Sequence, residues 1–372
     1  MLKLKSYSTV IFLTVFSFIF LLQTLGLFYG WLISFYLILI LPFFLYLFDY
    51  LAKVPLKFPK KLSITIIIFL GLLGISTYAN PNIIETSRFF FLYTAFCLIL
   101  LWVFNHKQEI YNPLIKLIFY FAVVLILFSL VLANLKLPFL DPGKLYGYQL
   151  VYPAFGSHNH LGDFLILPLL ALFYLLLIKW KNFYLLLFLS FSIFFILAFS
   201  RSAYASFLAV VFFIFIYFMK LKKIDLRSSL FFATIFFVVF YMFFAIVKEF
   251  QYINPFAKTN QYLSENNILH PKQFGGKRLE YFNQALQSAR DNPVFGIGLN
   301  NFYKASRKYG ASPYYWTYSS HNLFLDILVE AGVLSLLAFM VFLSRILTSL
   351  DKTKVFALIF FIALLLNFQT DY

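Results

Sequence analysis

The stretch 319-SSHNLFLDILVEAG-332 opens an apolar run that has the length and composition of a membrane-spanning helix, yet it contains a histidine and two carboxylates. On a helix, Asn322, Asp326 and Glu330 fall on one face, and His321 lies at the mouth of the span. A carboxylate inside a bilayer is costly, so we expect this face to point into the protein interior or a water-filled cavity.

The whole chain is too apolar for a soluble protein. Of its 372 residues, 62% are hydrophobic and 12% are charged, which is about half the charged share of a soluble domain. The composition therefore predicts an all-α integral membrane protein. The net charge of +16 lies mostly in short loops between apolar runs, which argues against a nucleic-acid partner. The single cysteine, Cys97, excludes an intrachain disulfide.

A transmembrane helix needs about 20 apolar residues. Eleven runs qualify, and we expect eleven transmembrane helices, or twelve if one weak span is miscounted: 7–28, 31–49, 62–79, 89–104, 115–133, 161–178, 182–199, 203–219, 229–247, 321–344 and 355–370. The runs 182–199 and 203–219 cannot form one straight span, because a helix of about 38 residues would be nearly 57 Å long. We expect the chain to turn back at Ser200–Ser202.

The distribution of Lys and Arg predicts the orientation. With the N-terminus inside, the short outer segments hold only four basic residues, namely Arg88, Lys136, Lys144 and Arg201, while most others lie in inner loops. The basic start and long apolar run at the N-terminus indicate a retained first span, not a cleaved signal peptide. Eleven spans then place the C-terminus outside.

Residues 248–320 are expected to form one large, partly helical outer loop between spans one to nine (1–247) and spans ten and eleven (321–372). From Arg278 the apolar spacing predicts an amphipathic helix along the outer interface, with Tyr281 and Ala285 on one face. The sequence Asp-Asn-Pro at 291–293 should end it, and Gly296 and Gly298 permit a tight turn.

Each candidate site residue has two interpretations. Arg201 is either a solvated hairpin arginine or a fixed cation for an anionic headgroup, and Arg278 is either a surface arginine or part of an anion site at a helix start. His321 is either an interfacial side chain beside an Asn322 cap or a functional group. For Asp326 and Glu330, polar packing between helices is favoured over direct chemistry.

Two further motifs are also ambiguous. Tyr315 and Trp316 in YYWTY, 314–318, form either an interfacial aromatic belt or a platform for sugar rings. His158 and His160 in GSHNHLGD, 156–163, suggest a metal, but no further ligand follows at the usual spacing. A helix start capped by Asn159 is favoured there, and we expect no metal site.

Four elements together resemble the O-antigen ligase and O-antigen polymerase superfamily. The segment SHNLFLDILVEAGVLSLLAF, 320–339, resembles its HN-x-x-L…E-x-G element, and FSRSAY, 199–204, its Ser-Arg element. KRLEYFNQALQSARDNPVFGIGLNNF, 277–302, resembles its Arg-helix-NP-x-x-G-x-G element, and Asn159 matches its Asn element. The order of the elements and the large late outer loop agree with that family.

The resemblance implies a multi-pass glycosyltransferase of the bacterial inner (cytoplasmic) membrane, with its site on the periplasmic face and membrane lipids around it. Such enzymes take a glycan from undecaprenyl diphosphate: ligases transfer it to the lipid A–core or a similar acceptor, and polymerases to another lipid-linked repeat unit. We expect a ligase-like enzyme, with a polymerase as the alternative. By motif match, Arg201 and Arg278 correspond to the arginines that engage the diphosphate, and His321 to the essential histidine.

The chemistry that follows is an inverting displacement of the diphosphate without metal or other cofactor. His321 would act as general base and the arginines would stabilise the leaving group. Asn159, Asn322, Tyr315 and Trp316 are the further candidates for substrate binding. A polysaccharide transporter or flippase is a third alternative, but the sequence lacks the internal repeats expected of one.

Overall fold

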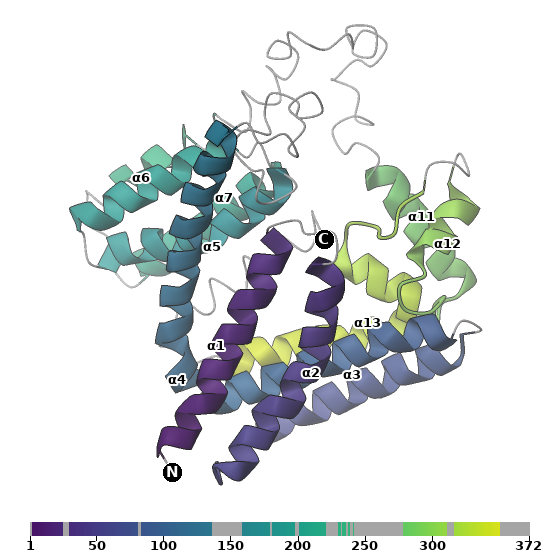
Figure 1. Cartoon of the computed structure of the whole chain (residues 1–372). Helices are drawn as coiled ribbons and strands as arrows, with labels where there is room; N and C mark the ends of the chain where they lie inside the picture. Colours follow the sequence, from purple (N-terminus) through teal and green to yellow (C-terminus); the bar gives the residue numbers. More distant parts are fainter. Residues whose placement is uncertain are drawn as a thin grey trace, which may run out of the picture. The chain divides into compact units, whose positions relative to one another are not determined.

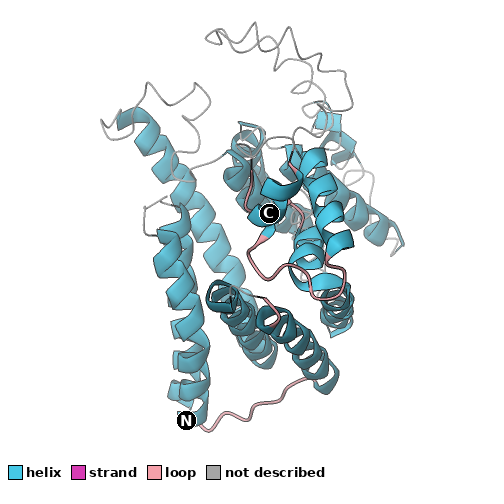
Figure 2. Cartoon of the chain, turned by 90° about the vertical axis from the view of Figure 1, so that its right-hand side faces the viewer, coloured by secondary structure: helices cyan, strands magenta, loops and turns pink. Residues whose placement is uncertain are grey.

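A computed structural model of the chain describes residues 2–24, 30–80, 83–135, 158–178, 181–197, 201–220, parts of 230–241, 278–310 and 316–349. In these parts the chain forms helices joined by loops, and no strand occurs (Figure 2). The predicted all-α class is therefore confirmed for the described residues.

The labelled helices correspond to the apolar runs in order, except that α4 joins two runs and that α11 and α12 lie between runs (Figure 1). Their bounds are α1 Leu2–Thr24, α2 Gly30–Leu51, α3 Lys60–Tyr78, α4 Ile83–Leu135, α5 His158–Ile178, α6 Asn182–Leu197, α7 Arg201–Lys220, α11 Arg278–Asp291, α12 Phe302–Tyr309 and α13 Leu323–Ser349.

Four of the described helical segments are long and apolar enough to cross a membrane. They are Ile33–Leu51, Lys60–Tyr78, Ile83–His106 and Leu323–Ser349. Shorter apolar segments lie in α1, α5, α6 and α7. The count of eleven spans, the orientation and the large outer loop remain predictions, since 136–157, 242–277 and 350–372 lie outside the described residues.

Two expectations about helix breaks have different outcomes. The expected interruption between the runs 182–199 and 203–219 is confirmed, because α6 ends at Leu197 and α7 begins at Arg201; Arg201 and Ser202, expected in the turn, belong to α7. The expected spans 89–104 and 115–133 are instead joined in the single helix α4, which contains Pro113. The polar residues between them do not need an exposed loop, because Asn105 accepts a hydrogen bond from the loop between α2 and α3 and His106 contacts Asp49 of α2.

The helices divide into two compact units. The first contains α1, α2, most of α4, and α5 to α7; α1 packs on α2, and α5 packs on α6 and α7. Its best-defined core joins α1, α2 and α4 through Phe12, Leu41, Leu45, Trp102 and Ile110.

The second unit contains most of α3, the start of α4, α11, α12 and α13. Phe69 of α3 stacks on Phe342 of α13, with ring centres 5.9 Å apart. The predicted helix from Arg278 to Asp291 is confirmed as α11, and its buried Ala285 and Ala289 pack against α12 and α13. Its apolar face therefore contacts protein in this unit.

Candidate active site

The predicted span that carries the HN…E-x-G element is a broken helix. Within α13, Gly332 has φ 82° and ψ 174°, which is far from helical geometry and separates two helical parts. A helix that breaks in this way frees backbone groups, and inside a membrane those groups need partners within the protein. The partners come from the segment between α11 and α12.

Backbone groups of 293–298 pair with those around the break. The N–H groups of Ile297 and Gly298 donate to the carbonyls of Val329 and Glu330, at 2.9 Å and 2.8 Å, and the Val333 N–H donates to the Pro293 carbonyl at 2.9 Å. The NP-x-x-G-x-G and E-x-G elements, which are about 30 residues apart in the sequence, are therefore joined main chain to main chain.

The glycines of both elements are required by this close approach. Gly296 and Gly332 have φ values of 66° and 82°, a region that glycine enters without strain. A Cβ on Gly296 would overlap the backbone around Glu330, and a Cβ on Gly332 would overlap the Val294 carbonyl. The predicted tight turn at Gly296 and Gly298 is confirmed, and Gly332 serves the same contact from α13.

The end of α3 completes this junction. The buried Ser76 hydroxyl lies 2.6 Å from the Phe295 carbonyl and 3.1 Å from the Glu330 carbonyl, and the Asn80 amide donates to the Ile297 carbonyl. Three elements distant in the sequence thus fix one another through polar groups that the interior would otherwise leave without partners.

Glu330 points into this junction. Its side chain is only 8% exposed, and its two carboxylate oxygens accept the N–H groups of Asn300 and Phe302 at 2.8 Å and 3.1 Å. The expectation that Glu330 faces the protein interior is confirmed. Its partners are main-chain groups of the loop that leads into α12, whereas the sequence suggested packing between helices.

Asp326, one helical turn before Glu330, holds the backbone next to His321 in place. It is 5% exposed, and one of its oxygens accepts the Ser320 N–H at 2.7 Å. The Ser320 hydroxyl in turn donates to the Asn322 carbonyl at 3.0 Å. The residue before His321 is therefore anchored to the first turns of α13.

Asn322, the residue after His321, is fixed as well. Its side-chain oxygen accepts the N–H groups of Phe324 and Leu325 at 3.0 Å and 3.1 Å, which makes it the N-cap of α13. The capping interpretation is confirmed. A role of Asn322 in substrate binding stays a prediction.

His321 lies between these two anchors in a left-handed conformation, with φ 59°. Such a value is uncommon outside glycine and persists where the surroundings determine it. The side chain is half-buried, and its ring centre lies 5.8 Å from that of Tyr281 on α11. The fold thus holds the imidazole in one place against an aromatic ring.

The two candidate arginines each begin a helix. Arg278 is the first residue of α11, so its backbone lies about one helical turn from Tyr281, the residue that contacts His321. Arg201 is the first residue of α7 and belongs to the other unit. Both side chains lie outside the described residues.

The aromatic motif before His321 is described in part. Trp316 packs against Tyr318 and against Tyr303 of α12, with ring centres 4.7 Å and 6.1 Å away, and the Thr317 N–H donates to Ser306 at 3.1 Å. Tyr315 lies outside the described residues. A role of either aromatic residue in sugar binding stays a prediction.

The histidine pair near residue 158 lies at a helix start. α5 begins at His158, so Asn159 and His160 fall in its first turn. Their side chains lie outside the described residues, so the roles proposed for Asn159 and the two histidines stay predictions. Among the described residues, no cluster of three His, Cys, Asp or Glu side chains has a metal-binding arrangement.

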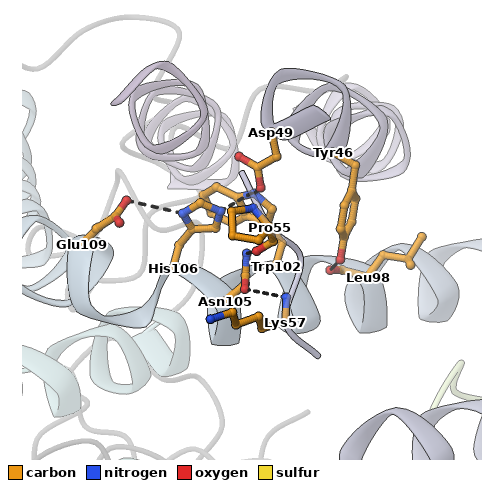
Figure 3. Close-up of polar contacts among 9 residues, drawn as sticks. All are labelled: Tyr46, Asp49, Pro55, Lys57, Leu98, Trp102, Asn105, His106 and Glu109. Carbon is orange, nitrogen blue, oxygen red and sulfur yellow. Dashed lines mark hydrogen bonds and ion pairs between the residues drawn. The ribbon is translucent and has the colours of Figure 1, made fainter. Parts of the chain in front are cut away.

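A second buried polar network, in the first unit, is absent from the sequence-based site (Figure 3). Asp49 of α2 is fully buried, and one of its oxygens accepts the indole N–H of Trp102 at 2.8 Å and contacts Nε2 of His106 at 2.7 Å. Nδ1 of His106 lies 3.4 Å from Glu109. Two features of the sequence could have indicated this network. Asp49 is an acid at the end of an apolar run, and Trp102 and His106 lie four residues apart at the end of a later one.

One comparison with known proteins, that with family models, agrees with the sequence resemblance. Residues 184–340 match the family model described as O-antigen ligase. The matched region contains Arg201, Arg278, His321 and Glu330. No curated protein and no solved structure matches the chain.

Proposed function

We infer that this chain, a member of the O-antigen ligase and polymerase superfamily through its residues 184–340, transfers a glycan from undecaprenyl diphosphate to a hydroxyl acceptor. The family consists of glycosyltransferase-like O-antigen ligases and polymerases. The acceptor of our proposal is the lipid A–core or a similar glycan, as in a ligase. The reaction takes place on the periplasmic side of the inner membrane.

The observation that carries this proposal is the fixed conformation of His321. Its φ of 59° is maintained by Asp326 through Ser320 on one side and by the Asn322 cap on the other. A left-handed histidine tied at both neighbours has the preorganisation that a catalytic group requires.

In the proposed reaction, the acceptor hydroxyl attacks the anomeric carbon while its proton passes to His321. An imidazole is partly neutral near physiological pH and can accept this proton. The bond from the anomeric carbon to the diphosphate oxygen breaks at the same time, and its electron pair leaves with the diphosphate. Attack opposite the leaving group inverts the anomeric centre.

Arg201 and Arg278 stabilise the negative charge that develops on the diphosphate, so the reaction needs neither metal nor nucleotide in this proposal. Fixed donors at a developing charge contribute about 10²–10³ in rate each. Asn159, Asn322, Tyr315 and Trp316 are proposed to contact the two glycans. Their motif positions and, for Trp316, the nearby ring of Tyr303 support this assignment.

The test is transfer by the purified chain from a lipid-diphosphate-linked glycan, with the His321→Asn variant beside the wild type. Asparagine accepts a positive φ, so this change removes the base and keeps the backbone conformation. We expect transfer to fall by about 10²–10⁴ at an unchanged unfolding temperature. His106→Asn is the control: it should retain transfer per folded molecule, because His106 belongs to the network around Asp49.

Undiminished transfer in His321→Asn would contradict the role of His321. Two acceptors are offered in parallel, a lipid A–core and a second lipid-linked repeat unit. Transfer to the first supports the ligase, and transfer only to the second identifies a polymerase. Movement of the lipid-linked glycan across a vesicle membrane without transfer to either acceptor would indicate a transporter.

A further inference from the structure

The short helix α12 carries a group of aromatic and basic side chains that the family motifs do not include. Phe302, Ala305 and Ser306 are buried and attach the helix to the unit, while Arg307 and Lys308 are exposed on its other side. The name aromatic–arginine cluster is used below for Tyr303, Arg307, Trp316 and Tyr318. Its three rings lie with centres 4.7 to 6.1 Å apart.

Arg307 is held by this cluster. Its guanidinium carbon lies 4.3 Å from the centre of the Trp316 ring and 5.7 Å from that of Tyr303. A guanidinium stacked on an aromatic face keeps its N–H donors in the plane of the group, where they can grip two oxygens of one carboxylate or phosphate.

The neighbouring basic residue, Lys308, has an acidic partner. Lys308 forms an ion pair with Asp291 at 2.9 Å, so its charge is matched within the unit. Among the described residues no ion pair of Arg307 with a carboxylate is found. Arg307 therefore combines a fixed position, an exposed side chain and a positive charge that no described acid neutralises.

The cluster also lies close to His321. Tyr318 is three residues before His321, so their Cα atoms are at most about 11 Å apart. The intervening backbone is fixed at both ends, since the Thr317 N–H donates to Ser306 of α12 and the Ser320 N–H donates to Asp326 of α13. The aromatic–arginine cluster and His321 are thus joined by three residues of fixed backbone within the second unit.

We propose that Arg307, stacked on Trp316, forms an oxyanion subsite beside His321 that binds a carboxylate or phosphate of the glycan substrates. The subsite rests on the proposed function for its place next to a reacting centre. It gives the enzyme a preference for acidic substrates, because a guanidinium fork recognises paired oxygens while the surrounding rings pack on the C–H faces of sugars. The anionic group comes either from an acidic sugar or from the lipid diphosphate.

The experiment measures binding to the purified full chain by titration calorimetry, so that it does not depend on transfer. The probes are a trigalacturonate for the carboxylate source, inorganic pyrophosphate for the phosphate source, and maltotriose as the neutral sugar. We expect Arg307→Ala to lower the affinity for one of the two anionic probes by about 10- to 100-fold, since the loss of hydrogen bonds to a charged group has an effect of this size on binding. The probe that is weakened identifies the source.

Two variants control the result. Arg290→Ala removes another exposed arginine, in the last turn of α11, and should leave both affinities unchanged. Arg307→Lys keeps the charge without the fork and should fall between wild type and Arg307→Ala; it also serves as the test if the alanine variant does not fold.

The subsite is refuted if Arg307→Ala and Arg307→Lys bind both anions as the wild type does. It is also refuted if Arg290→Ala weakens the binding of the anions equally, which would indicate general electrostatic attraction. The same holds if Arg307→Ala weakens the binding of maltotriose as much as that of the anions. A chain that binds an anion through Arg307 yet transfers no glycan would retain the subsite and contradict the proposed function.

Discussion

Each of the two units buries a carboxylate, and the hydrogen-bond donors of the two carboxylates differ in kind. In the first unit, Asp49 meets two side chains, Trp102 and His106, which both project from α4 (Figure 3). In the second unit, Glu330 meets two main-chain N–H groups, those of Asn300 and Phe302. Both carboxylates avoid the cost of an unpaired buried charge.

Whether the donors are side chains or main-chain groups determines how far each network can tolerate substitution. A side-chain donor can be removed together with its acceptor, so the Asp49 network links α2 to α4 in a way that other residues could replace. A main-chain donor can be removed only by substitution with proline, which the φ of 57° at Asn300 does not allow, so the loop before α12 needs an acceptor at position 330. The second arrangement fixes a loop, and that loop packs on α13, the helix that follows His321.

The largest expected effect is that of Glu330→Ala. It leaves two buried N–H groups without an acceptor, at a cost of about 1–3 kcal/mol each. We expect a lower unfolding temperature and, because the loop and the start of α13 lose their common anchor, a fall in kcat of about 100-fold, the size associated with a displacement of about 1 Å. Activity and thermal unfolding of the purified variants measure both effects.

Glu330→Gln sharpens this prediction. It keeps the side-chain volume and one acceptor oxygen, so it should lie between the wild type and the alanine variant in both measurements. Wild-type kcat and unfolding temperature in Glu330→Ala would show that the carboxylate does not hold the loop.

The sequence predicted those features that depend on neighbouring residues. The helix from Arg278, its end at Asp291 and the Asn322 cap follow from local rules of helix periodicity, termination and capping. The partners of Glu330 could not be predicted in this way. They lie about 30 residues away and are backbone atoms, which leave no trace in the residue types.

Two predictions about helix breaks were wrong, each for a physical reason. The run 321–344 read as one continuous span, although Gly332 breaks it, because the pairing of Val333 with Pro293 is invisible in hydropathy. The polar residues around 105–109 read as a loop between two spans, although α4 continues through them. A buried Asp49 on another helix makes a histidine acceptable there, and periodicity carries no information on that contact.

An intermediate effect is expected for Asp49→Asn. The amide oxygen can replace the single carboxylate oxygen that Trp102 and His106 share, but both hydrogen bonds then lose a charged acceptor, at a cost of about 1 kcal/mol each. We expect a lower unfolding temperature with unchanged transfer per folded molecule, because this network joins helices and does not hold the His321 loop. The measurement is thermal unfolding beside the transfer assay.

Adding Trp102→Phe to Asp49→Asn tests the comparison directly. The second change removes the indole donor, whose hydrogen bond Asp49→Asn has already weakened, so the double variant should lose less stability than the sum of the two single losses. The main-chain donor at Asn300 cannot be removed in the same way, because proline does not adopt its φ of 57°. Strictly additive losses would show that Trp102 and Asp49 do not depend on each other, and loss of transfer in a folded Asp49→Asn would assign this network to the reaction.

The smallest effect is expected at an exposed carboxylate of the second unit, which completes the comparison. Asp291 ends α11 and accepts hydrogen bonds from Lys308, at 2.9 Å, and from the Tyr309 hydroxyl of α12. These bonds, that of Lys308 first, lower the pKa of Asp291 below its ordinary value. The folded state therefore binds this proton more weakly than the unfolded state, and the stabilisation is present above the ordinary pKa of aspartate, near pH 4.

As pH falls through the lowered pKa of Asp291, this contribution disappears. The unfolding temperature of the wild type should exceed that of Asp291→Asn slightly and by a constant amount at neutral pH, and the two curves should converge in acid. The bond to Asp291 also raises the pKa of Lys308, so that the lysine stays charged throughout this range. A difference between the two unfolding temperatures that does not shrink in acid would show that it does not come from the ionised Asp291 carboxylate. A difference as large as that of Glu330→Ala would contradict the small contribution usual for surface ion pairs.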